Sequence, residues 1–217
     1  MTLLFNSANR QVAGFAIATI GWILFTTSMG LVEWRLWYME NPSHSTHGLA
    51  CVGIWRICIY HQQYNSNLSH TKSCHQYTYY DAFLPVSIRV SQHLLLAANL
   101  LGLLGKASIT FALRNVYMSL VWRNSFFNPL VFSGILYITA SVCVSVTVLW
   151  NYYSVVNVEG IAFPPSFRVP FKPDAQEAGS AIFMAALAAF LMFSSGMVFC
   201  FYSTPLDRKV HPKVSTL

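Results

Sequence analysis

Four long stretches of this 217-residue chain are almost free of charged side chains, and they constrain its fold more than any other feature. Each is long enough to cross a bilayer as a helix, which needs roughly 20 apolar residues. We expect the spans at residues 11–32, 82–105, 129–150 and 178–202. Charged residues make up only 9% of the chain, against about 25% in soluble domains. The sequence therefore predicts a single four-span membrane domain over residues 1–217.

The first stretch has a rival interpretation as a signal peptide, because it lies near the N-terminus. No charge occurs between Arg10 and Glu33, so the apolar run exceeds the ~7–15 residues of a signal-peptide core. We therefore expect a retained membrane span.

The distribution of charge predicts which side of the membrane each connection occupies. Residues 1–10, 106–128 and 203–217 hold seven basic side chains and one acidic side chain, whereas residues 33–81 and 151–177 hold five basic and six acidic. Basic residues in short connections are retained on the cytosolic side. Both termini are therefore expected in the cytosol, and residues 33–81 and 151–177 outside the cell.

The first external segment, residues 33–81, has the pattern of β-strands. Residues 34–39 and 76–80 alternate along the chain and are rich in aromatic side chains, which favours strands. Asn41-Pro42-Ser43 is typical of a turn. The prolines of residues 151–177 argue against a long helix in the second external segment.

Three cysteines, Cys51, Cys58 and Cys74, fall in the first external segment. An oxidising compartment allows them to form a disulfide, and a small unit of ~50 residues usually needs such a staple. Cys51 can pair with either of the others or stay free as a small buried apolar residue. The residues alone leave this choice open.

Three short motifs are candidates for modification or binding. Asn67-Leu68-Ser69 is a glycosylation sequon, and Cys200 near the end of the fourth span is a candidate for palmitoylation. The C-terminal Ser215, Thr216 and Leu217 suit capture by a PDZ scaffold protein as an added strand. The alternatives are an unused sequon, a plain membrane-facing cysteine and a chance match at the C-terminus.

Several function classes are not expected. Five of the seven histidines lie in residues 33–81, but none has the spacing of a recognised metal site. The spans contain no carboxylate pair, and the chain has no glycine-rich phosphate loop, so we predict neither an enzyme nor a bound cofactor. Membrane lipid is an expected partner. Nucleic acid is not, because no basic run exceeds Arg208-Lys209.

A set of residues around the first external segment resembles the signature of the claudin family of tight-junction proteins. The set comprises Trp34, Gly53-Ile54-Trp55, Cys58, Cys74 and Arg89, with Ile54 in place of the usual leucine. Residues 177–183, Gly196 and Cys200 of the fourth span are also claudin-like, and the resemblance covers the whole chain. The chain departs from the family by a longer interval between Cys58 and Cys74 and by the extra Cys51, as a divergent member would.

The resemblance implies a membrane α+β fold, with a left-handed bundle of four helices and a small extracellular antiparallel β-sheet. It pairs Cys58 with Cys74 and makes Trp34, Gly53, Trp55 and Arg89 architectural. For Arg89 it favours a bond that docks the sheet on the helices over a side chain that snorkels to the membrane interface. The position at which the family carries arginine, however, aligns with Gln92. Small residues would let the helices approach closely, namely Gly102, Gly105, Gly179 and Gly196.

The resemblance also implies the function. A protein of this family associates with itself and with other claudins, within one membrane and across two cells, to seal or selectively permeate the paracellular space. Phe163 and Phe167 are expected as exposed tips that touch the opposing cell. The acids Glu33, Glu40 and Asp81 balance the bases Arg35, Arg56 and Lys72, which predicts no charge selectivity. The alternative is an auxiliary subunit or trafficking partner of another membrane protein.

Overall fold

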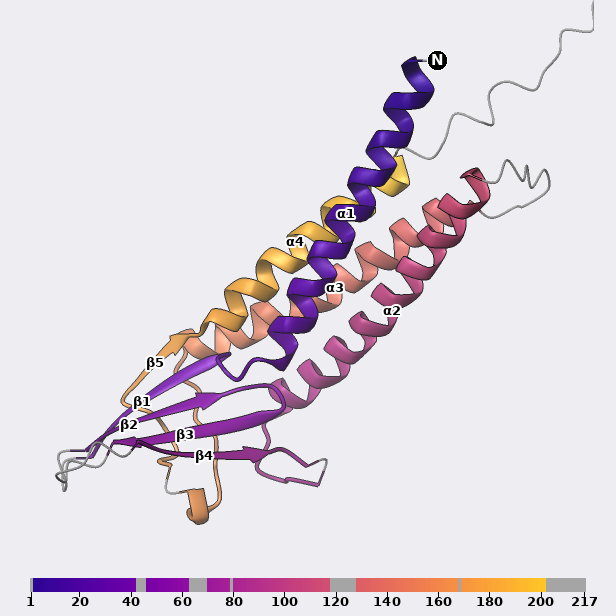
Figure 1. Ribbon diagram of the computed structural model, residues 1–217. Helices are drawn as coiled ribbons and strands as arrows, with labels where there is room; N and C mark the ends of the chain where they lie inside the picture. The colour runs from indigo at the N-terminus through magenta and orange to yellow at the C-terminus, as the bar shows by residue number, and fades with distance from the viewer. Residues whose placement is uncertain are drawn as a thin grey trace, which may run out of the picture.

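The computed structural model describes residues 2–41, 46–62, 70–78, 80–117, 128–167 and 169–201. Within them, four helices run side by side and a single sheet lies at one end of the bundle (Figure 1). The helices are α1 (Thr2–Gly30), α2 (Val86–Tyr117), α3 (Pro129–Val156) and α4 (Ser180–Phe201). All four are long and apolar enough to span a membrane. The predicted four-helix anchor is therefore confirmed, while the left-handed sense of the bundle stays a prediction.

The sheet has five antiparallel strands in the order β4-β3-β2-β1-β5. Its strands are β1 (Arg35–Asn41), β2 (Thr46–Val52), β3 (Arg56–Gln62), β4 (His70–Gln76) and β5 (Ala175–Ala178). Strand β5 comes from the connection between α3 and α4, so both long connections join in one sheet (Figure 1). The small antiparallel sheet that the family resemblance implied is confirmed.

The sheet has one face packed against a hydrophobic cluster and one face turned away from it. Register partners share a face, so the inner face carries Trp37, Ala50 and Ile59 in one row and Val52 and Ile57 in another. These side chains are at most 3% exposed. We call the opposite side the outer face; it carries Leu36, Tyr38, Cys51, Cys58, Tyr60, Lys72 and Cys74.

One predicted strand is wrong. Strand β4 ends at Gln76, whereas the aromatic alternation predicted a strand over residues 76–80. The N–H of Tyr77 donates to the Trp55 carbonyl, and the N–H of Asp81 donates to the Thr78 carbonyl. The Asp81 carboxylate also accepts from the Thr78 N–H at 2.7 Å. The Tyr77 bond continues the β3–β4 register by one pair, and the two bonds between Thr78 and Asp81 then close a turn that leads into α2.

Glycines and other small residues bring the helices together. A Cβ at Gly134 of α3 would lie 2.8 Å from the Gly196 carbonyl of α4, and a Cβ at Gly196 would lie equally close to the Gly134 carbonyl. Gly102 packs on Trp22, and Gly105 packs on Tyr137. Gly179 instead lies against the Glu33 backbone at the base of the sheet. Close packing of this kind is what holds helices together in lipid.

Candidate functional site: the sheet and its seat on the helices

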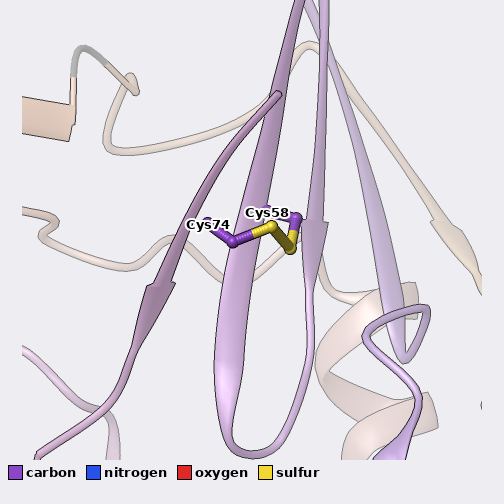
Figure 2. The surroundings of a disulfide bond; sticks show 2 residues. All are labelled: Cys58 and Cys74. Carbon is purple, nitrogen blue, oxygen red and sulfur yellow. A yellow bond between two sulfur atoms is a disulfide. The ribbon is translucent and has the colours of Figure 1, made fainter. Parts of the chain in front are cut away.

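A disulfide joins Cys58 of β3 to Cys74 of β4 across directly opposed positions (Figure 2). This is the pairing that the family resemblance implied. The two cysteines are 16 residues apart, and closing a loop of that size stabilises a fold by about 3 kcal/mol in the chain-entropy model. The bridge fixes the edge strand β4 to the rest of the sheet. Cys51 keeps a free thiol and is buried.

Where the sheet meets the helices, a set of contacts joins the two, and we call this set the seat. Its members are Trp34, Arg35, the Gly53-Ile54-Trp55 connection, Arg89 and Gln92. Trp34 belongs to it: the side chain is fully buried in the core of the bundle. Its indole N–H donates to the Ser28 carbonyl at the end of α1 at 3.1 Å. The Trp34 carbonyl accepts from the N–H of Gly179, just before α4. Trp34 therefore ties the start of β1 to the first and fourth helices.

The tight connection between β2 and β3 is the second part of the seat. The N–H of Gly53 donates to the Arg56 carbonyl at 2.9 Å. A Cβ at Gly53 would lie 2.8 Å from that carbonyl oxygen and 2.9 Å from the Cα of Val32. Only glycine fits between these two backbones. The turn places Ile54, which is 1% exposed, in the core of the bundle. Trp55 is partly buried and packs against the same core.

Gln92 and Arg89, both on α2, donate hydrogen bonds to the connections at this end of the sheet. The Gln92 amide donates to the Ile54 carbonyl at 2.8 Å, so Gln92 reaches directly under the Gly53-Ile54-Trp55 connection. Arg89, one turn earlier, donates to the Asp81 carbonyl at 2.8 Å. Arg89 thus contacts the connection between β4 and α2, and Gln92 contacts the connection between β2 and β3.

Arg35 is the most extensive part of the seat, and sequence reasoning missed it. Its side chain is only 1% exposed. The Nε and Nη2 groups donate to Asn151 Oδ1 of α3 at 3.2 and 2.8 Å, and Nη2 also donates to Ser87 Oγ of α2 at 3.4 Å. The Asn151 amide in turn donates to Ser91 Oγ and to the Thr147 carbonyl. One guanidinium therefore links β1 to two helices.

Burial lowers the pKa of Arg35 to about 10, and the nearby Glu159 carboxylate opposes that shift. Arg35 therefore stays charged at neutral pH. A buried charge that keeps its hydrogen-bond partners fixes their geometry, because leaving any of them unpaired is costly. Arg35 was counted among the charges of the external surface, which is wrong. The signal that finds it is position: it shares the inner face with Trp37, two residues along β1.

The expectation that Phe163 and Phe167 form exposed tips is also wrong. Both are half-buried beneath the sheet. Phe163 packs edge-on against Trp37 with ring centroids 5.6 Å apart, and Phe167 packs against His75 at 4.9 Å. Both also contact Phe83. Because they fill the cluster under the inner face, the second connection supports the sheet. Its exposed aromatic side chain is Phe171, at 60% exposure.

The outer face and the β4 edge carry exposed polar and aromatic groups. Lys72 lies over the Tyr60 ring at 5.4 Å, and every described side chain of β4 from Lys72 to Gln76 is exposed. At the other end of the face, the Tyr38 hydroxyl donates to Glu177 Oε2 at 3.2 Å. This part of the site has few buried contacts, in contrast with the seat.

Some predicted site residues lie elsewhere. Asn67, Ser215, Thr216 and Leu217 fall outside the described residues. The Cys200 thiol faces α3, where a Cβ at Gly134 would lie 2.7 Å from its sulfur. Among the residues with described positions, no group of three or more His, Cys, Asp or Glu side chains is arranged to hold a metal ion.

Four membrane-length helices that carry one disulfide-stapled sheet define a multi-pass membrane protein with a folded domain at one end. The family described as "PMP-22/EMP/MP20/Claudin tight junction" matches residues 19–201. The chain belongs to this family.

Similar curated proteins share the full span of the chain. Claudin-3 of Canis lupus familiaris is 23% identical over 212 residues, covering 95% of this chain and 88% of the relative. Claudin-3 of Mus musculus and of Rattus norvegicus are each 21% identical over 212 residues, covering 96% of this chain and 89% of the relative. Near-complete coverage at low identity agrees with a divergent member of the family.

Proposed function

We propose that this protein associates with itself and with other claudins, within one membrane and across two cells, to seal or selectively permeate the paracellular space. The observation that carries the proposal is the contrast within the sheet. Its inner face packs on a hydrophobic cluster and the helices, whereas Tyr38 on the outer face and the side chains of β4 from Lys72 to Gln76 are exposed. Cys51 and Cys58, between them on the outer face, are buried. A rigid sheet presented in this way is suited to contact with another copy.

The β4 edge supports contact through the backbone. The Cα atoms of Cys58 and Cys74 are 4.1 Å apart, which is the spacing of a non-hydrogen-bonded antiparallel pair. In such a pair the N–H and C=O groups point away from the partner strand. The backbone groups of Lys72, Cys74 and Gln76 therefore point to the open edge, where an incoming strand can pair with them.

The charges at the two edges support a direction for this contact. The exposed Arg56 and Lys72 lie on β3 and β4, whereas the exposed Glu177 lies on β5 at the opposite edge. Opposite charges favour packing of the β4 edge of one copy beside the β5 edge of the next. A contact between two different surfaces that does not close into a ring produces an open filament, as a continuous junction requires.

We further propose that the sheet is extracellular and that both termini are cytosolic. The sheet and the two ends of the described chain lie at opposite ends of the bundle (Figure 1), and the disulfide requires an oxidising compartment. In this orientation Asn67 is available for glycosylation outside the cell. Cys200 lies close to the cytosolic surface as a palmitoylation candidate. The C-terminal Ser215, Thr216 and Leu217 are available to a PDZ scaffold protein.

Freeze-fracture electron microscopy of fibroblasts that lack junctions tests the proposal. Expression of this chain alone should give continuous intramembrane strands at cell contacts. Lys72→Glu, which reverses a charge at the β4 edge, should break the strands. Lys172→Glu, an equal change in the exposed second connection, should leave them intact. Scattered particles from a surface-delivered wild-type chain would contradict the proposal. Copurification with a single channel or receptor would then favour an auxiliary subunit.

A further inference from the structure

Three cysteines stand in one row across three neighbouring strands. Cys51 of β2 is the register partner of Cys58 of β3, and Cys58 is the register partner of Cys74 of β4. Directly opposed residues of antiparallel strands point to the same face. All three therefore lie on the outer face, with the free Cys51 thiol on one side of Cys58 and the bridged Cys74 on the other.

Cys58 is within bridging reach of both neighbours. Because Cys58 and Cys74 form the narrow kind of antiparallel pair, Cys51 and Cys58 form the wide, hydrogen-bonded kind, with Cα atoms about 5.5 Å apart. That spacing lies inside the range of about 4.4–6.8 Å that disulfides span. Cys51 and Cys74 are two strand spacings apart, roughly 9.5 Å, and cannot be bridged without movement of the backbone.

We infer that Cys51, Cys58 and Cys74 form an exchangeable disulfide row, in which Cys51 displaces Cys74 from Cys58 and leaves a Cys74 thiol on the edge strand as a modification site. The Cys51 thiolate attacks the Cys58 sulfur; the Cys51–Cys58 bond forms, the Cys58–Cys74 bond breaks, and Cys74 leaves as a thiolate. No oxidant or reductant is consumed. The row places the attacking and leaving sulfurs on opposite sides of Cys58, as displacement at sulfur requires.

The surroundings of Cys51 explain why the exchange is slow. Burial raises the pKa of the Cys51 thiol, the Glu33 carboxylate adds to this rise, and Lys72 opposes it. Cys51 is only 4% exposed, so its attacking thiolate is scarce at neutral pH and external reagents do not reach it. Cys74 belongs to an exposed stretch of β4. Once released, its thiolate can attack an incoming disulfide, which forms a mixed disulfide and expels the other sulfur as a thiolate.

Substitutions separate the two pairings. In Cys74→Ser, Cys51 and Cys58 remain neighbours and should form a bridge. In Cys58→Ser, the two remaining cysteines are too far apart and should both stay reduced. Arg56 and Lys72 separate the three cysteines, so trypsin places each in its own peptide and the bridge can be mapped by mass spectrometry. The mapping uses total cellular protein, so a variant retained inside the cell still reports its pairing.

A membrane-impermeant maleimide applied to intact cells tests the exchange in the wild-type chain. Slow labelling of Cys74 is expected, and it should be lost in Cys51→Ser, which removes the attacking thiol. Equal labelling of Cys74 with and without Cys51, or no labelling of the wild-type chain, would overturn the inference. So would free Cys51 and Cys58 thiols in Cys74→Ser. The wild-type Cys58–Cys74 bridge, mapped in the same way, is the control for the proposed orientation. Its absence would mean that the sheet does not face an oxidising compartment, and would overturn the orientation instead of the inference.

Discussion

The seat and the outer face of the sheet are held by different kinds of contact. In the seat, Trp34, Arg35 and Ile54 are at most 1% exposed, and their bonds reach all four helices or the connections next to them. On the outer face, Tyr38 is 40% exposed and Lys72 rests on a neighbouring ring. The difference indicates that the seat sets how the sheet stands on the membrane anchor, while the outer face is left available for other molecules.

The seat holds most of the family signature, with Ile54 and Gln92 as its two departures from the family pattern. The signature residues Trp34, Gly53 and Trp55 all belong to the seat. Two further departures lie outside the seat: the extra Cys51 is on the outer face, and the long interval between Cys58 and Cys74 joins β3 to β4. A divergent chain can therefore keep the architecture of the family while it changes what the sheet contacts.

The largest expected effect is that of Gly53→Ala, which tests whether the seat tolerates any added volume. The new Cβ meets two backbones, the Arg56 carbonyl and the Val32 Cα, and neither can move as a side chain would. Overpacking of this kind costs about 3 kcal/mol, measurable as a lower unfolding temperature in detergent. The matched control is Gly30→Ala, because a Cβ at Gly30 meets nothing within 4 Å. Equal unfolding temperatures for the two variants would contradict the assigned role of Gly53.

Arg35→Leu should have the next largest effect. It removes both bonds to Asn151 Oδ1 and leaves that buried acceptor unpaired, which costs about 2 kcal/mol. Arg56→Leu, an exposed arginine of the same sheet, should change stability by less than about 0.5 kcal/mol. Adding Asn151→Leu to Arg35→Leu should recover part of the loss. If Arg35→Leu and Arg56→Leu unfold at the same temperature, the guanidinium does not hold the seat.

Gln92→Leu should be milder. It removes one hydrogen bond, from the Gln92 amide to the Ile54 carbonyl, which is worth about 1 kcal/mol. Gln92→Arg restores a donor that can reach the same carbonyl and should unfold at close to the wild-type temperature. A loss in Gln92→Arg as large as that in Gln92→Leu would show that the site requires the shape of glutamine, and that the bond itself is unimportant.

Tyr38→Phe should have the smallest effect on stability. The hydroxyl it removes makes one exposed bond, to Glu177 at 3.2 Å, so the change should stay within about 0.5 kcal/mol. Thermal unfolding in detergent checks this. A drop comparable to that of Arg35→Leu would mean that the outer face also holds the sheet in place, and the contrast between the two regions would be lost.

Much of the architecture could be predicted because its signals are local. Long uncharged runs identify helices that cross membranes, and the resemblance identified the Cys58–Cys74 bridge. The strand predicted over residues 76–80 is wrong because the alternation of aromatic side chains there competes with a turn that the Asp81 carboxylate closes. The periodicity of side chains carries no information about that hydrogen bond. The side chains of Phe163 and Phe167 were misplaced because nothing in the sequence shows that the second connection folds beneath the sheet.

The seat was only partly predictable for a related reason. Trp34 and Gly53 carry a family signature, but Arg35 is a cation in a segment with many charged neighbours, and its burial depends on Asn151, 116 residues away. A single sequence does not reveal that pairing. Arg89 drew attention as a charge at the head of a span, while the neutral Gln92 donates to the Ile54 carbonyl in the connection between β2 and β3.

Amide hydrogen exchange tests most directly the claim that the seat is architecture and the β4 edge is the contact surface. Exchange would be compared between the monodisperse protein in detergent and the same protein in membranes that carry strands. The outward-pointing amides of Lys72, Cys74 and Gln76 should exchange rapidly in detergent and become protected on assembly. The amides of Gly53 and Gly179, which donate to the Arg56 and Trp34 carbonyls in the seat, should be protected in both states. Unchanged exchange of the β4 edge in strand-bearing membranes would contradict the claim.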